Sequence, residues 1–109
     1  MPSNIKFELI VTIVNKGFSC DVVDAAKMAG AEGSTIIHGR GTGINENAKL
    51  MGIPIEPEKE IILTLIDNKK TNKVLKSITD AADLNAPKKG IAFVLDVEKV
   101  AGICHLDKK

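Results

Sequence analysis

The chain has 109 residues, of which 44% are hydrophobic and 27% are charged, and its formal net charge is +1. This length suits a single soluble domain, and the absence of a basic block, with only three aromatic residues, argues against nucleic-acid binding. No stretch approaches the ~20 apolar residues of a membrane span, and two distant cysteines form no disulfide framework, so we expect a cytoplasmic protein.

The first part of the chain predicts a strand, a helix and a second strand. Residues 5–14 are rich in Ile, Val and Phe and are apolar on both faces, which is typical of a strand in the middle of a sheet. Ser19 is suited to cap a helix that ends near Ala29, where Gly30 provides the stop. The second strand then covers residues 33–38.

The later part repeats this order. Residues 59–66 form a strongly apolar strand, and residues 70–82 carry apolar side chains at helical spacing. The fourth strand covers residues 90–95, with a short helical turn expected at 96–100. Two strand–helix–strand units in the single domain 1–109 predict a ferredoxin-like α+β sandwich: a βαββαβ antiparallel sheet with both helices on one face. Because the other face is also apolar, we expect self-association to cover it.

A glycine alternation, Gly39, Gly41 and Gly43, follows the second strand. It is open to two interpretations, a loop that needs positive φ or a backbone that closely approaches an anion or nucleotide. The spacing does not match a dinucleotide-binding fingerprint, and no helix follows. The segment 40–57 is long for a connection inside a domain, and its large apolar side chains should dock on the domain or on a partner.

His38 and Arg40 lie at a spacing of two, which places them on one side of the second strand. Both could face a phosphate, or His38 could be a partly buried strand residue, which is the interpretation we favour for it. Arg40 is the better anion contact, because a guanidinium is a bidentate donor. The alternating acids at 56, 58 and 60 are most simply a solvated face.

The sequence offers no convincing catalytic set. Cys20 has no base placed beside it, which indicates a structural cysteine. Cys104 and His105 are adjacent and supply only two of the four ligands that a structural zinc site needs. Because no nucleophile–base pair is visible, we do not expect an enzyme.

The sequence resembles the P-II nitrogen regulatory proteins and their P-II-like relatives in three places. These are EGSTIIHGRGTG (32–43), the long loop 40–57 and KGIAFVLDVEKV (89–100). The resemblance extends over nearly the whole chain in order and spacing. It implies a trimer of ferredoxin-like subunits that binds adenine nucleotides in clefts between subunits. It also implies a regulator that contacts a partner, often a membrane transporter, through a long T-loop corresponding to segment 40–57.

The resemblance assigns roles to particular residues. It implies nucleotide contacts, for ADP, AMP or ATP, at Thr35, Gly41, Gly43 and Gly90, and the charged side chains of Arg40, Lys88 or Lys89 would then lie on the phosphates. It implies partner contacts in the loop at Asn45, Leu50, Met51 and Ile53. Where the family has Thr-Gly-Lys-x-Gly-Asp-Gly-Lys, this chain has LNAPKKGI (84–91), which keeps the last glycine and offers two lysines. An alternative is a metal-binding module on the same fold, like the CutA copper-tolerance proteins, using His38, Cys104 or His105.

Overall fold

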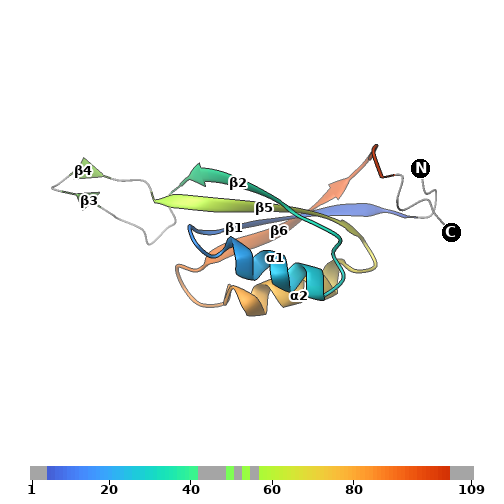
Figure 1. Ribbon diagram of the computed structural model, residues 1–109, viewed down its shortest axis with the longest axis horizontal. Coiled ribbons are helices and arrows are strands. Elements are labelled where there is room, and N and C mark those ends of the chain that lie inside the picture. Colours follow the sequence, from blue (N-terminus) through green and yellow to red (C-terminus); the bar gives the residue numbers. More distant parts are fainter. Residues whose placement is uncertain (1–4, 42–48, 51–52, 55–56, 104–109) are drawn as a thin grey trace.

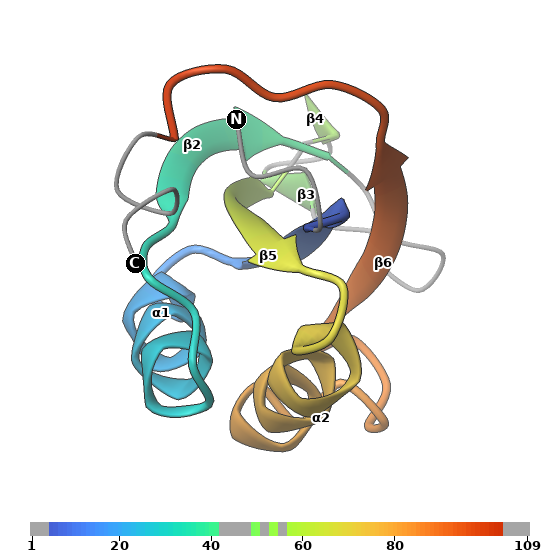
Figure 2. The same ribbon diagram turned by 90° about the vertical axis from the view of Figure 1, so that its right-hand side faces the viewer.

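The protein is described here by a computed structural model, which covers residues 5–41, 49–50, 53–54 and 57–103. In chain order its elements are β1 (Phe7–Asn15), α1 (Ser19–Met28), β2 (Thr35–Arg40), β3 (Lys49–Leu50), β4 (Ile53–Pro54), β5 (Glu58–Asp67), α2 (Thr71–Ala81) and β6 (Gly90–Val97). Four of the strands form an antiparallel sheet in the order β2-β5-β1-β6 (Figure 1). Figure 2 shows both helices on one side of this sheet. The predicted ferredoxin-like βαββαβ sandwich is therefore confirmed.

Two strands end two residues later than the sequence indicated, and β2 also begins two residues later, at Thr35. β2 extends through Arg40 instead of ending at His38, because its ladder with β5 continues to that point. β6 extends through Val97, so the helical turn expected at 96–100 is wrong: its first two residues pair with β1 instead. In both cases pairing with a central strand decides where the strand ends, and local sequence does not show it.

The segment 40–57 also contains regular structure. β3 and β4 pair with each other as an antiparallel hairpin, with Lys49 opposite Pro54 and Leu50 opposite Ile53. This hairpin forms a separate two-stranded sheet beyond the end of the main one (Figure 1). The sequence predicted only a loop here, because each strand is too short to show an alternating pattern.

The start of α1 differs from the prediction, whereas its end agrees with it. Ser19 is the first helical residue instead of the cap; Phe18 occupies the N-cap position and makes no side-chain capping bond. At the other end Gly30 has φ +118°, and the N–H of Ala31 donates to the carbonyl oxygen of Ala26 at 2.9 Å. A glycine in the left-handed region after the last turn is the stop that the sequence predicted.

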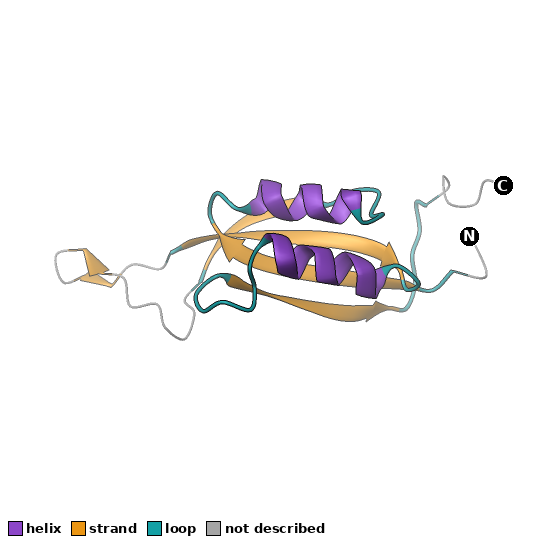
Figure 3. Ribbon diagram, turned by 90° about the horizontal axis from the view of Figure 1, so that it is seen from below, coloured by secondary structure: helices purple, strands orange, loops and turns teal. Residues whose placement is uncertain are grey.

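The core lies between the sheet and the helices, which lie side by side across the same face (Figure 3). The central strands contribute Ile10, Val14, Ile62 and Ile66, and the helices contribute Val22, Ala26, Val74 and Ile78, all of them buried. The small side chains of Ala26 and Ala29 allow α1 to pack closely on the sheet. The apolar side chains at helical spacing in residues 70–82 thus include Val74 and Ile78 on the buried face of α2.

The other face of the sheet, called the helix-free face below, is apolar on all four strands. Its side chains come from alternate positions: Leu9, Val11, Ile13, Ile37, Ile61, Leu63, Leu65, Ile91, Phe93 and Leu95. The register aligns them in rows, as where Val11 lies opposite both Leu63 and Phe93. Phe93 is still 40% exposed and Leu95 49%. A contiguous apolar surface of this kind indicates an interaction site.

One short segment crosses this side of the sheet. After β6, residues 98–103 pass from the β6 edge toward the β2 edge on the side opposite the helices (Figure 2). Ile103 is buried and lines a pocket together with Phe7 and Leu65. The segment therefore covers the end of the helix-free face that lies away from segment 40–57.

Candidate functional site

Four chain segments meet at the end of the main sheet where segment 40–57 leaves it. β2 and β1 end there, and β5 and β6 begin there; we call it the loop end. The N–H of Gly41 donates to the carbonyl oxygen of Pro57 at 3.2 Å, just beyond the paired strands. This bond closes the base of the segment and fixes where its two ends leave the sheet.

Glu60 holds the first turn of α1 in place from the neighbouring strand β5. The residue is only 7% exposed, and its Oε1 accepts hydrogen bonds from the N–H groups of Gly17 and Ser19, both at 3.0 Å. It thereby supplies the capping oxygen that Phe18 lacks, and its negative charge suits the positive end of the helix dipole. The prediction of a solvated acidic face is therefore wrong for Glu60, whereas Glu58 is exposed as expected.

The environment of Glu60 makes the stability of the fold depend on pH. Burial acts to raise the pKa of Glu60, but the hydrogen bonds from Ser19 and Gly17, together with the nearby His38, outweigh burial and hold the pKa below its ordinary value of 4.5. Because the folded-state pKa is the lower one, this stabilisation is present above about pH 4.5 and is lost as the pH falls through the folded-state value.

We therefore expect Glu60→Gln to lower the thermal midpoint near neutral pH, and the midpoints of the two proteins to converge below about pH 4.5. Differential scanning calorimetry between about pH 3 and about pH 7 measures both curves. Glu98→Gln, which changes an exposed glutamate after β6, is the matched control and should follow the wild type throughout. A deficit of Glu60→Gln that stays the same at every pH would contradict this account.

His38 and Arg40 share one side of β2, as predicted, because they lie opposite Glu60 and Glu58 of β5. His38 is exposed, with 72% of its side chain accessible, so the favoured prediction of a partly buried histidine is wrong. Its Nδ1 lies 3.8 Å from Oε2 of Glu60, which places the imidazole close to a carboxylate. β2 is an edge strand, and an edge strand has no second neighbour to bury its side chains.

The turn before β6 is tied to the loop end by an asparagine that the sequence reasoning did not single out. Asn15 donates from Nδ2 to the carbonyl oxygen of Lys88 at 3.1 Å, and its Oδ1 accepts from Nζ of Lys59 at 2.7 Å. Lys88 has φ +67°, in the left-handed region, and both Lys88 and Lys89 are exposed. Asn15 thus joins β5, β1 and this turn, and only the fold shows that these three are neighbours.

Glycine stands at these positions of the candidate site for different structural reasons. Gly90 has φ +144°, and a Cβ added there would overlap the carbonyl oxygen of Ile13. Gly39 and Gly41 do not have positive φ, so that interpretation of the alternation is wrong for these two. A Cβ on Gly39 would lie 3.2 Å from Cδ1 of Ile61, and one on Gly41 would lie 4.0 Å from Cγ of Lys59. Gly41 therefore has room beside it.

One chain does not bring the whole predicted nucleotide set together. Arg40 and Gly41 lie at the β2 edge of the sheet, and Lys88, Lys89 and Gly90 lie at the β6 edge. The register row through His38, Glu60, Val14 and Gly90 crosses the full sheet, so the two edges are about 14 Å apart. Thr35 lies at the far end of β2, about 17 Å from Arg40.

Other predicted site residues belong to segment 40–57. Gly43, Asn45 and Met51 lie outside the described residues. Leu50 and Ile53 lie opposite each other in the β3–β4 hairpin. Cys104 and His105, the ligands named for the metal alternative, also lie outside the described residues. Within the part of the chain that the structure describes, no three His, Cys, Asp or Glu side chains are grouped to hold a metal ion.

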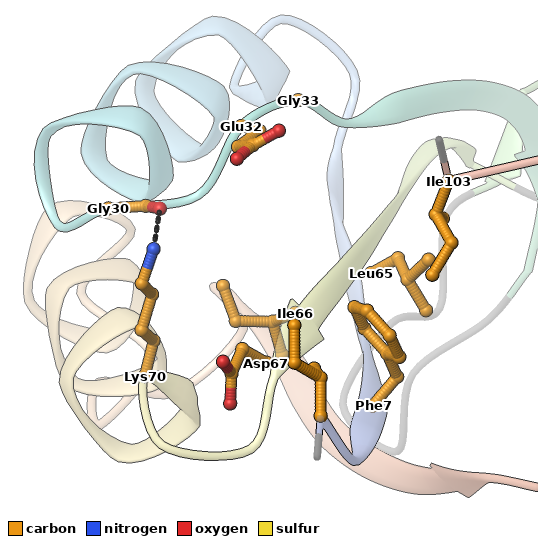
Figure 4. A pocket seen from close by; sticks show the side chains of 10 residues that line it. Phe7, Gly30, Glu32, Gly33, Leu65, Ile66, Asp67, Lys70 and Ile103 are labelled. Carbon is orange, nitrogen blue, oxygen red and sulfur yellow. Dashed lines mark hydrogen bonds between the residues drawn. The ribbon is translucent and has the colours of Figure 1, made fainter. Parts of the chain in front are cut away.

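A pocket of about 370 Å³ lies at the opposite end of the sheet (Figure 4). One wall is apolar and consists of Ile5, Phe7, Leu65, Ile66 and Ile103. The other contains Glu32, Asp67 and Lys70, with Gly30 and Gly33 between them. None of the residues predicted to bind a nucleotide lines it. Its residues come from separate segments and form no motif, so no sequence pattern marks it. In the described residues no helix is long and apolar enough to cross a membrane.

Comparison with known proteins agrees with this architecture. Among protein families, Nitrogen regulatory protein P-II matches residues 7–105. Among solved structures, the PII protein of Arabidopsis thaliana bound to citrate superposes with a TM-score of 0.71 at 21% sequence identity, over 95% of this chain and 89% of that chain. No curated protein sequence matches the chain. The family match spans nearly all of the described sheet and both helices, and the chain therefore belongs to the nitrogen regulatory protein P-II family.

Proposed function

We propose that this chain is a non-enzymatic P-II signalling protein of the cytoplasm that binds an adenine nucleotide between the subunits of a homotrimer and passes its state to a partner protein. The observation that carries the proposal is the separation of the candidate ligand residues. Arg40 and Gly41 lie at one sheet edge, and Lys88 to Gly90 lie about 14 Å away at the other. A ligand lying along the β2 edge would contact both groups if a second copy brings its β6 edge beside the β2 edge of the first.

The helix-free face supports the trimer. Its ten apolar side chains extend over all four strands, and Ile91, Phe93 and Leu95 of β6 remain largely exposed in one copy. Packing three such faces against one another removes this surface from water at about 25 cal/mol for each Å². The same packing would bring the β6 edge of one subunit close to the β2 edge of the next.

The nucleotide would lie along the free edge of β2. Thr35 at one end and Arg40 at the other are separated by the length of an extended ligand, with the base near Thr35 and the phosphates near Arg40. Lys88 and Lys89 of the neighbouring subunit would supply further positive charge. Lys88 stands where the family segment has its second glycine, and its φ of +67° keeps a backbone path that usually requires glycine.

The segment 40–57 would be the partner-contacting part, as the T-loop is in the family. Its two ends are held at the β2 edge of the sheet, because the N–H of Gly41, which follows Arg40, donates a hydrogen bond to the carbonyl oxygen of Pro57. A ligand that binds one arrangement of the segment more tightly than another raises the population of the first arrangement, and the difference between the two affinities sets the size of the change. Asn45, Leu50, Met51 and Ile53 are the proposed contacts, and a membrane transporter is the proposed class of partner.

Thermal shift with a ligand panel tests the binding. ATP, ADP, AMP, 2-oxoglutarate, citrate, copper and zinc are compared, since a ligand at a hundred times its Kd stabilises the native state by about 2.7 kcal/mol. We expect an adenine nucleotide to raise the midpoint. We also expect Arg40→Ala to weaken its binding about tenfold or more, because a charge-assisted hydrogen bond contributes about 1.5–3 kcal/mol.

Lys27→Ala is the matched control, because Lys27 is an exposed cation in the last turn of α1, on the helix layer. It should leave the nucleotide shift unchanged. A panel in which only copper or zinc raises the midpoint would favour the metal-binding alternative. A nucleotide shift equal in Arg40→Ala and wild type would remove Arg40 from the site.

A further inference from the structure

We propose that the pocket at the end of the sheet away from the loop binds a free α-amino acid with an aliphatic side chain. This site is separate from the nucleotide site proposed above and does not depend on it. The pocket opens between the start of β1, the end of β5, the α1–β2 connection and the residue before α2. Its volume of about 370 Å³ lies at the small end of the range for ligand sites, which suits a metabolite of amino-acid size.

One side of the pocket is suited to an aliphatic group. Phe7 is 4% exposed, Ile66 is 3% and Ile103 is 8%, so these side chains are held by the fold and do not need to move to receive a ligand. Leu65, at 37%, still has apolar surface to bury. Figure 4 shows Phe7, Leu65 and Ile103 together on one side of the space. A branched aliphatic side chain placed against them would leave water at about 0.8 kcal/mol for each CH₂ group.

The other side carries charges of both signs. Lys70 donates from Nζ to the carbonyl oxygen of Gly30 at 3.4 Å, which uses one of the three hydrogens of its ammonium group. The side chain of Asp67 accepts one bond, on Oδ1 from the N–H of Lys69 at 2.9 Å, and an ionised carboxylate has about four acceptor positions. Figure 4 shows Lys70 across the space from Phe7, Leu65 and Ile103, with Asp67 beside Ile66 between the two. Both can thus bind a ligand without breaking a bond of the fold.

A zwitterionic head group matches this arrangement. The ammonium group of an amino acid would bond to Asp67, in the field of Glu32, and its carboxylate would bond to Lys70. Asp67 and Lys70 place one carboxylate and one ammonium group at the pocket. A nucleotide phosphate or a fatty acid would bond to Lys70 but would place a second negative charge near Asp67. An aliphatic amino acid meets the apolar wall and both signs of charge.

The binding test uses L-leucine with two analogues that each lack one charged group. Isoamylamine has no carboxylate, and 4-methylpentanoate has no ammonium group. L-leucine is titrated into the full chain and monitored by ¹H–¹⁵N NMR spectra. The amide chemical shifts of residues that line the pocket, such as Gly33 and Asp67, should change and reach saturation. We expect each analogue to bind about tenfold more weakly or worse, because each loses one charge-assisted contact. Equal binding of either analogue would overturn the amino-acid assignment.

Three variants test the site itself. Asp67→Asn keeps an oxygen for the N–H of Lys69 but removes the charge, and it should weaken L-leucine about tenfold; Asp96→Asn on β6 is its control. Lys70→Met should weaken L-leucine but leave isoamylamine unaffected, with Lys69→Met as its control. Gly33→Leu should abolish binding by filling the space, because a Cβ at Gly33 has no atom within 4 Å and its φ is not positive.

Two further results would overturn the proposal. One is L-leucine binding that survives Gly33→Leu in a protein with an unchanged thermal midpoint. The other is displacement of bound L-leucine by ADP in direct competition, which would assign the pocket to the nucleotide site. Loss of nucleotide binding in Arg40→Ala without any change in L-leucine binding would support two separate sites, and it distinguishes a failure of this inference from a failure of the proposed function.

Discussion

Phe93→Asp is expected to convert the proposed trimer to a folded monomer. Phe93 lies on β6 in the helix-free face, opposite Val11 of the central strand β1, and is 40% exposed in one copy. In the proposed trimer its ring would be buried among apolar side chains. An unpaired carboxylate in such a place costs several kcal/mol, and every 1.4 kcal/mol changes an equilibrium constant tenfold. The variant should therefore weaken association by about a thousandfold or more.

Sedimentation velocity or size-exclusion chromatography with light scattering measures the mass, and circular dichroism shows that the fold is retained. Met28→Asp is the matched control, because Met28 is 89% exposed on α1, on the other side of the sheet. It introduces the same charge and should leave the mass at that of the wild type. A wild type that is monomeric at micromolar concentration, or a trimer that persists in Phe93→Asp, would contradict the proposed assembly. Nucleotide binding should disappear together with the trimer, because each site needs two copies.

The fold was predictable because it rests on patterns that repeat along the sequence. Apolar residues on both faces of β1 and β5 indicated central strands, and the helical spacing of Val74 and Ile78 indicated the buried face of α2. Gly30 marked the end of α1 correctly. These signals are local, and they agree with the tertiary structure because each apolar stripe meets one face of a single sheet.

The candidate site was only partly predictable, because its contacts are not local. Glu60 caps α1 from a strand that lies 41 positions later in the chain, so its spacing with Glu58 pointed to a solvated face instead. Asn15 links Lys59 to Lys88 across three elements, and no motif marks it. The pocket beside Asp67 is built from four separate segments. Sequence pattern shows which residues are apolar or charged, but only the register shows which of them meet.

Gly90→Ala is expected to destabilise the fold by about 3 kcal/mol or more. Two costs add at this position. Gly90 has φ +144°, a conformation that costs a non-glycine residue about 1–3 kcal/mol. An added Cβ would also overlap the carbonyl oxygen of Ile13 and lie 3.1 Å from Cγ1 of Val14 and 3.3 Å from Cδ2 of Leu84. Because the nearest atom belongs to the backbone of β1, the strand pair itself must shift, which costs roughly 1–3 kcal/mol more.

Gly17→Ala and Gly102→Ala separate the two costs. Both glycines have positive φ, +100° and +87°, but an added Cβ at either would have no atom within 4 Å. Each control should be destabilised only by the cost of placing a non-glycine residue at positive φ. Gly90→Ala carries both costs and should lower the thermal midpoint by roughly 10–20 °C. If all three variants fall by the same amount, the close approach of β6 to β1 is not what requires glycine. Gly90→Ala is also a poor test of the proposed nucleotide site, because reduced binding in this variant would reflect a displaced β6 edge before it reflected a lost contact. Arg40, Lys88 and Lys89 are exposed, so truncating their side chains should leave the core unchanged, and they are therefore the better probes of phosphate binding.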